Sequence, residues 1–202
     1  MLSAIDGWMS AKRPGPRPSP VYRDLVILIA ATACRLGEAL AVCREDVDLD
    51  YEIPGVRKPV LHITGTIVYD ASEGGLFRQP YTKSNGAGDR TVVVPTLAAA
   101  VVRRRMLAVK SNEHGALFAT KTGRWLSLNN TNARFREVIL QDTNVAGWFE
   151  LRQLRSATGT AVADVAAAQM GNTREIAESH YIHRAKLAPT APITSRMSGE
   201  AR

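Results

Sequence analysis

The sequence predicts an α+β fold, mainly helical, with a small three-stranded antiparallel sheet at one edge. A length of 202 residues suits one hydrophobic core and one main domain. Apolar and amphipathic runs with helical spacing lie on both sides of a central stretch. That stretch, residues 59–95, holds three segments rich in β-branched and aromatic residues, separated by turns that contain glycine.

Composition and charge narrow the class of partner. The chain is 45% hydrophobic and 22% charged, which is typical of a globular protein and excludes wholesale disorder. The net charge of +7 favours a polyanionic partner, although ribosomal proteins and many solvated surfaces are equally basic. Cys34 and Cys43 lack the paired spacing of a zinc site, so we expect no metal, no cofactor and a reducing cytosol. The apolar run at residues 25–34 is far too short to cross a bilayer, so we expect no membrane partner.

Prolines predict the domain boundaries. Residues 1–9 have the pattern of the end of an upstream helix, and residues 11–20 form a proline-rich basic connector that cannot be helical. We therefore assign residues 1–20 to a helix end and linker, residues 21–184 to the main domain and residues 185–202 to a tail.

Arg35 and Glu38 lie inside an apolar run, residues 21–43, that predicts a buried central helix pair. A buried arginine costs several kcal/mol unless its charge is paired. One interpretation is an internal ion pair with Glu38, one turn away. The other is that Glu38 holds the backbone while Arg35 faces an anion in a cleft.

Three strands are predicted at residues 59–69, 76–81 and 90–95. Lys83 lies in the loop that joins the last two strands. A lysine in such a loop is usually only solvated, so its position alone assigns no role.

Two amphipathic helices are predicted at residues 97–109 and 130–141, with an extended piece at residues 117–118 between them. Asn130 or Thr131 is expected to cap the second helix. Its Arg134 and Arg136 either contact DNA or face water.

The C-terminal part begins with two arginines, Arg152 and Arg155, and continues into an alanine-rich helix at about residues 159–170. A Gly-Asn break containing Asn172 and a short helix then lead to Tyr181.

These segments resemble, in the same order, four motifs of the tyrosine recombinases, the phage integrase family. The family pattern runs Thr-Gly-x-Arg-x-x-Glu-Leu, then Thr-Lys-x-x-x-x-Arg-Thr-Val-x-Val-Pro, then His-x-x-Arg, Leu-Gly-His and a tyrosine nine residues later. The resemblance covers about residues 21–183 and implies the family's catalytic domain, with the small sheet at its edge. The implied catalytic residues are Arg35, Lys83, Arg152, Arg155, Asn172 and Tyr181, with Glu38 as structural support and Arg90, Arg134 and Arg136 as DNA contacts.

The second catalytic arginine has two possible registers. Residues 152–155 place Arg155 there, whereas residues 149–152 place Arg152 there. We prefer Arg155 because the small residues that follow it fit the start of the family's next helix.

The chain departs from the family at two histidines. Arg152 cannot accept a proton at any working pH, and Asn172 donates hydrogen bonds but supplies no proton. The missing histidines keep an alternative open, a degenerate relative that only binds DNA as a regulator. A type IB topoisomerase activity shares the same chemistry and also stays open.

The resemblance further implies a site-specific recombinase that cleaves and rejoins DNA through a 3′-phosphotyrosyl intermediate, without metal or ATP, to integrate or excise a phage or mobile element. It implies double-stranded attachment-site DNA as partner, a tetramer on that DNA, a directionality factor and the cytoplasm of a bacterial host.

Overall fold

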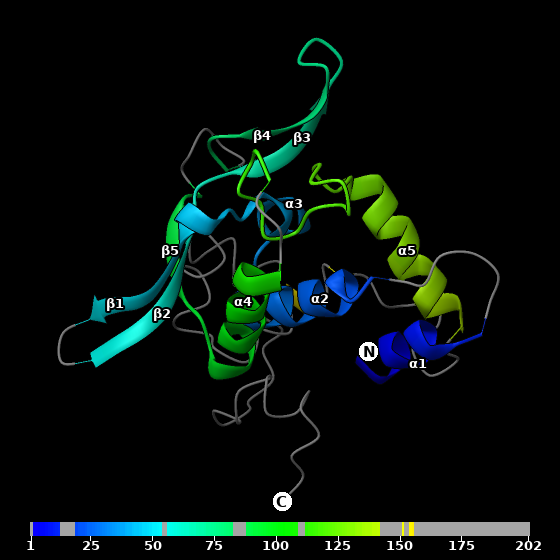
Figure 1. Ribbon diagram of the computed structural model, residues 1–202, viewed down its shortest axis with the longest axis horizontal. Coiled ribbons are helices and arrows are strands. Elements are labelled where there is room, and N and C mark those ends of the chain that lie inside the picture. Colours follow the sequence, from blue (N-terminus) through cyan, green and yellow to red (C-terminus); the bar gives the residue numbers. More distant parts are fainter. Residues whose placement is uncertain are drawn as a thin grey trace, which may run out of the picture.

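The computed structural model describes residues 2–12, 19–53, 56–82, 88–108, 112–141, 151, 154 and 155. Helices α2 and α3 lie at the centre, with α4 on one side and α1 and α5 on the other (Figure 1). Two β-hairpins project from this helical body (Figure 1). The predicted α+β class, with a small three-stranded antiparallel sheet, is confirmed.

The helices agree closely with the sequence pattern. The α-helices are α1 Leu2–Ser10, α2 Val21–Thr32, α3 Leu36–Ala41, α4 Thr96–Ala108 and α5 Leu128–Gln141, and η1 Arg44–Asp46 is a short 3₁₀ helix. The strands are β1 Val47–Ile53, β2 Val56–Ile63, β3 Thr66–Asp70, β4 Gly75–Gln79 and β5 Arg90–Val93.

Helix α2 is buried nearly all round, which confirms the predicted central helix pair. Its one buried carboxylate, Asp24, is bonded by Arg104 and by Arg105 of α4, the latter from Nε to Oδ2 at 2.6 Å. Arg105 also lies over the ring of Phe118. The arginine run of α4 is therefore in part a buried contact between helices.

The strand pairing differs from the prediction. The predicted strand at residues 59–69 is split at Thr64 and Gly65 into β2 and β3. Strand β4 pairs with β3 in a separate two-stranded hairpin, and the three-stranded sheet has the order β1-β2-β5. Strand β1, which the sequence pattern missed, pairs with β2 antiparallel.

A buried carboxylate explains the split. Arg78 of β4 donates to both carboxylate oxygens of Asp46 at 3.0 and 3.1 Å, and the Thr64 hydroxyl donates to the same carboxylate at 3.0 Å. Arg78 also donates to the Ala41 carbonyl at 3.0 Å. A Cβ at Gly65 would lie 2.8 Å from the Arg78 guanidinium carbon, so the chain needs a glycine where it leaves the sheet.

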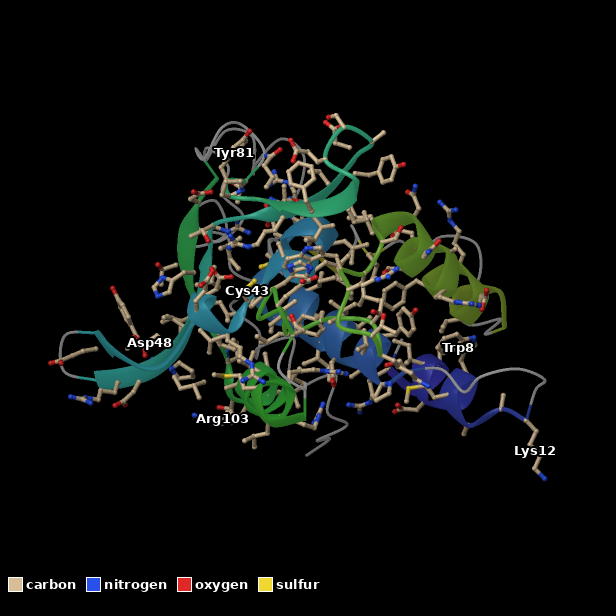
Figure 2. All side chains as sticks on the ribbon, turned by 45° about the horizontal axis from the view of Figure 1, so that its top comes forward. Trp8, Lys12, Cys43, Asp48, Tyr81 and Arg103 are labelled. Carbon is tan, nitrogen blue, oxygen red and sulfur yellow. The ribbon has the colours of Figure 1, made fainter. Side chains whose placement is uncertain are left out.

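Helix α1 packs on the rest of the domain. Leu2, Ile5 and Trp8 are buried and belong to the same hydrophobic core as α2 and α4. The Trp8 ring meets Tyr22 edge to face, and Tyr22 in turn meets Phe135 of α5. Figure 2 places Trp8 between α1 and α5. The boundary assigned at residue 20 stays a prediction.

Two details of the C-terminal half complete the comparison with the sequence. Helix α5 begins at Leu128, and the Ser127 hydroxyl accepts the Asn130 N–H at 3.4 Å, so the cap expected at Asn130 or Thr131 was placed too late. Ala116 and Ala119 form isolated bridges to Cys43 and to Trp125, and residues 117–118 between them bend, so this segment is a bridged loop. The predicted helix at residues 159–170 and the tail lie outside the described residues.

Candidate active site

The break between α2 and α3 positions Arg35. Helix α2 ends at Thr32, whose hydroxyl donates to the Leu28 carbonyl at 2.7 Å and whose Oγ1 lies 3.0 Å from the Cys34 sulfur. Ala33 then turns the chain with a φ of 55°. This left-handed conformation costs a residue with a Cβ roughly 1 kcal/mol. Ala33 stands where the family pattern has glycine, and a glycine, which has no Cβ, avoids this cost.

Glu38 binds two arginines with one carboxylate. Its Oε1 accepts Nη1 of Arg35 at 2.8 Å, and its Oε2 accepts the Arg35 backbone N–H at 2.9 Å. The same Oε2 accepts Nη2 of Arg90 at 2.9 Å. The Glu38 side chain is 1% exposed and that of Arg90 7%, whereas that of Arg35 is 31% exposed. Arg35 is therefore the member of this trio that reaches solvent.

The surroundings of Glu38 keep it ionised. Burial alone would raise the pKa of its carboxyl, but the Arg90 charge and the hydrogen bonds from Arg90 and Arg35 outweigh burial and lower that pKa. One negative charge between two guanidiniums leaves the trio with a net positive charge, which suits an anionic ligand.

The segment between β4 and β5, to which Lys83 belongs, was predicted to join two paired strands, and this is wrong because β4 pairs with β3 and β5 pairs with β2. The described ends of this segment form hydrogen bonds. The Thr82 backbone N–H and hydroxyl both donate to Oδ1 of Asp89, at 3.0 and 2.8 Å. On the other side, Nη1 of Arg90 donates to the Gly88 carbonyl at 2.9 Å. Lys83 itself lies outside the described residues.

Arg155 is buried, at 4% exposure, and the neighbouring Leu154 belongs to the hydrophobic core. Burial raises the pKa of the Cys34 thiol to about 11, and the charges of Arg90 and Arg155 act in the opposite direction. Arg155 is thus near enough to Cys34, the residue before Arg35, for its charge to act there. The two C-terminal arginines cannot be compared directly, because Arg152 lies outside the described residues.

The predicted site residues are therefore placed only in part. Arg35, Glu38 and Arg90 form one ion-paired group, and Arg155 acts on Cys34 beside it. The predicted residues outside the described part of the chain are Lys83, Arg152, Asn172 and Tyr181.

The two arginines predicted to contact DNA from α5 are exposed. Arg134 donates to both carboxylate oxygens of Glu137, at 2.8 and 3.0 Å. Burial raises the pKa of Tyr22, and the charge and hydrogen bond of Arg134 oppose this rise. Arg136 is exposed on the same helix. Their contact with DNA stays a prediction.

Sequence reasoning missed two contacts of this site, the pair of Arg90 with Glu38 and the clamp of Asp89 on Thr82. The first joins residues too distant in sequence for spacing to indicate it.

Among the residues that the structure describes, no helix is long and apolar enough to cross a membrane. Within the same residues, no group of three or more histidine, cysteine or acidic side chains could hold a metal ion.

No protein-family model and no curated protein sequence matches the chain. Solved structures do resemble it. The Tn1549 transposon integrase in complex with a circular intermediate DNA has a TM-score of 0.70 at 12% identity, over 97% of this chain and 61% of that one. The XerH site-specific recombinase bound to a palindromic difH substrate has a TM-score of 0.63 at 15% identity, over 92% of this chain and 47% of that one. The XerA recombinase has a TM-score of 0.58 at 14% identity, over 100% of this chain and 60% of that one.

This chain therefore spans between about half and three fifths of the length of these solved chains. At such low sequence identities, the structural likeness shows the fold alone. That fold agrees with the order of the sequence motifs. The ion-paired Arg35 at the helix break and the small antiparallel sheet β1-β2-β5 belong to a chain that has the fold of the tyrosine recombinase catalytic domain.

Proposed function

We propose that the chain is the catalytic domain of a site-specific DNA recombinase that integrates or excises a phage or mobile element. One observation carries this proposal. Glu38 holds Arg35 at the break between α2 and α3, and the charge of buried Arg155, from a distant part of the sequence, acts on Cys34, the residue before Arg35. The solved structures of the same fold include an integrase and a recombinase bound to DNA, which supports a DNA substrate.

The two arginines suit a phosphodiester under attack. Negative charge grows on its two non-bridging oxygens, and planar guanidiniums neutralise that charge through paired hydrogen bonds. In this proposal Arg35 and Arg155 bind those oxygens. The burial of Arg155, at 4% exposure, supports its assignment as the second catalytic arginine. Charge arranged in advance of the reaction is usually the largest contribution to catalysis.

Tyr181 is the proposed nucleophile. Its phenolic oxygen bonds to phosphorus while the bond from phosphorus to the 5′ oxygen breaks, which leaves a 3′-phosphotyrosyl link and a free 5′ hydroxyl. Lys83 gives a proton to the departing oxygen, and the phenolic proton leaves to water or phosphate because Arg152 cannot accept it. Arg152 and Asn172 contribute positive charge and a hydrogen bond to the phosphate. Rejoining runs these steps in reverse, and the covalent link conserves the energy of the broken bond, so rejoining needs no ATP. The arginines and Lys83 neutralise charge and supply the proton in this proposal, so no step needs a metal.

The remaining partners follow from the same family resemblance. Double-stranded attachment-site DNA is the proposed substrate, with a tetramer of the protein on DNA and a directionality factor, in the cytoplasm of a bacterial host. Because the chain spans only part of its structural neighbours, these partners are proposed for the whole protein.

A covalent trapping experiment tests the proposal. The chain is incubated with a library of duplexes that have a randomised central segment and a nick, so that a short 5′-hydroxyl fragment diffuses away after cleavage. We expect a DNA adduct that survives denaturation, maps to Tyr181 and disappears in Tyr181→Phe. An adduct that persists in Tyr181→Phe would refute the assignment.

The same library distinguishes the alternatives. The two missing histidines favour a regulator that only binds DNA, and this alternative predicts salt-sensitive retention of duplexes with no adduct on any of them. A type IB topoisomerase instead predicts that plasmids lacking the selected sequence are relaxed as fast as plasmids that contain it.

A further inference from the structure

Charge is unevenly distributed along this basic chain. Of its 19 acidic and 26 basic side chains, residues 45–79, which include the β1–β2 and β3–β4 hairpins, carry seven and three. The two projecting hairpins are therefore negative in a chain whose net charge is +7. Because a DNA duplex repels carboxylates, this part of the protein is poorly suited to DNA and better suited to a basic partner.

The end of the β3–β4 hairpin, residues 69–74, combines negative charge with an exposed aromatic ring, and we call it the acidic tip. Tyr69 is 73% exposed, and Asp70 and Glu73 beside it are also exposed. Oδ1 of Asp70 accepts the Ser72 backbone N–H and hydroxyl at 2.8 and 2.6 Å, which orders the turn. A surface that is ordered before binding loses less conformational entropy when a partner docks on it.

The outer face of α4 has the opposite charge around an exposed leucine. This basic face consists of Ala100, Arg103, Arg104 and Leu107, which lie within one turn of each other along the helix. Leu107 is 89% exposed, and Arg103 is exposed as well. Protein–DNA interfaces are polar and highly charged, so an exposed leucine beside arginines fits a protein partner better than a duplex.

The acidic tip and the basic face lie far apart on one molecule. In Figure 1 the β3–β4 hairpin is above α3, and α4 is below it. Figure 2, seen from a different direction, separates the hairpin from Arg103 of α4 in the same way. The two surfaces cannot meet within one molecule, yet they are complementary in charge and each exposes an apolar side chain. A second copy of the chain is therefore the partner that fits both.

We propose that the acidic tip of one copy docks on the basic face of the next, with Tyr69 against Leu107 and the tip carboxylates against Arg103. Because each copy contributes two different surfaces, the contact is heterologous and builds a ring or a chain of copies. The inference deepens the proposed tetramer and rests on that proposal for its role on DNA.

Charge reversal in the full chain tests the contact. One variant combines Asp70→Lys with Glu73→Lys, and the other combines Ala100→Glu with Arg103→Glu. Sedimentation equilibrium at low salt, up to millimolar protein, measures self-association. We expect the wild type to associate and each variant alone to associate at least about 10-fold more weakly, because its two surfaces then carry like charges.

An equal mixture of the two variants should recover the association. In the mixture each tip meets a helix face of opposite sign, so the contact forms between unlike variants. A wild type that stays monomeric over the whole concentration range would overturn the proposal, and so would a mixture that associates as weakly as its components.

The matched control reverses charge on the other hairpin. Asp50→Lys with Glu52→Lys changes the net charge by the same amount as the tip variant, and both side chains are exposed. This control is expected to associate as the wild type does. An equal loss of association in the control and in the tip variant would mean that overall charge governs association, which would overturn the contact.

Two further variants test the apolar part of the contact. Tyr69→Thr keeps the preference for a strand and Leu107→Gln the preference for a helix, and both positions are exposed, so the unfolding midpoint should not change. Each is expected to weaken association about 10-fold, since aromatic and apolar side chains at the centre of an interface contribute most to its affinity. Unchanged association in both would contradict the proposal.

DNA binding separates a protein partner from a duplex. If the acidic tip contacts DNA, Tyr69→Thr weakens binding of a short duplex at dilutions where the chain is monomeric. We expect no change, and a loss would overturn the contact between copies. The covalent adduct reports the proposed function separately: an adduct without self-association overturns this contact alone, whereas self-association without any adduct overturns the proposed recombinase alone.

Discussion

At the scale of single residues, Glu38 sets the electrostatics of the site. Its carboxylate is almost fully buried and is bonded by the backbone of Arg35 and by both guanidiniums. An ionised group in such a place is tolerated only because each of its oxygens has cationic or amide donors. Glu38 thus links Arg35 at the helix break to Arg90 at the start of β5, and its role as support for a catalytic arginine stays a prediction.

The lowered pKa of Glu38 predicts a pH-dependent stability. Its ionised form stabilises the folded chain, and this contribution is complete above the ordinary pKa of about 4.5 and is lost as the pH falls through the lower folded-state value. Glu38→Gln should therefore lower the urea midpoint at neutral pH, with a difference from wild type that shrinks below about pH 4.5. Urea unfolding at a series of pH values measures this, and a difference that stays constant across the series would contradict it.

At the scale of elements, α2 and α4 are joined by a buried carboxylate. Asp24 is 1% exposed and lies on a helix that is otherwise apolar toward its neighbours. Arg104 and Arg105 bind it from α4, while Arg103 is exposed (Figure 2). Three successive arginines on one helix therefore have different environments, because successive positions point about 100° apart.

This arrangement predicts a large contrast between neighbouring substitutions. Arg105→Ala removes a buried partner of Asp24 and the contact with Phe118, and should lower the free energy of unfolding by about 3 kcal/mol. Arg103→Ala, at an exposed position two residues away on the same helix, should change the free energy of unfolding by no more than about 0.5 kcal/mol. Denaturant unfolding of the two variants measures the contrast. A similar loss of unfolding free energy in both would show that the contact of Arg105 with Asp24 adds little to stability.

At the scale of the whole molecule, α1 and the central helices share one core. Ile5 is 0% exposed and Trp8 3%, and both belong to the cluster that contains Leu25 and Leu28. A segment that buries such side chains cannot be removed without exposing apolar surface on its neighbours. The helix before the proline-rich connector is therefore packed on the domain that follows it.

A core substitution in α1 tests whether it folds with the rest. Ile5→Ala should lower the free energy of unfolding by about 2 to 5 kcal/mol, since it leaves a cavity in the shared core. The exposed Ser3→Ala should stay within about 0.5 kcal/mol. The transitions seen by circular dichroism and by fluorescence should coincide in both variants. An unchanged midpoint in Ile5→Ala would mean that α1 is a dispensable tail and would support a boundary at residue 20.

Much of the helical framework was predictable because its signals are local. The apolar run at residues 21–43 predicts a buried helix pair whatever it packs against, and the amphipathic runs of α4 and α5 predict their lengths to within two residues. The motif order predicted the fold, and an ion pair of Arg35 with Glu38 was one of the two interpretations of that spacing. These features follow from hydrophobic periodicity and from spacings within a single turn.

The strand pairing was not predictable, because partners are chosen by contacts that local propensity does not report. Residues 59–69 have one continuous β pattern, yet the segment is divided between two hairpins. At the point of division, Asp46 accepts hydrogen bonds from Thr64 and from Arg78. Likewise, no spacing or motif near Arg90 in the sequence indicates that Glu38 is its partner.

What the sequence by itself determined is the set of helices, the order of the motifs and the kinds of charged group available for chemistry. The tertiary structure decided which of those charges meet: Arg90 with Glu38, Arg105 with Asp24, and Arg155 with the surroundings of Cys34. The physical reason is that an ion is stable inside a protein only where the fold supplies its counter-ion, and that supply depends on segments far apart in the chain.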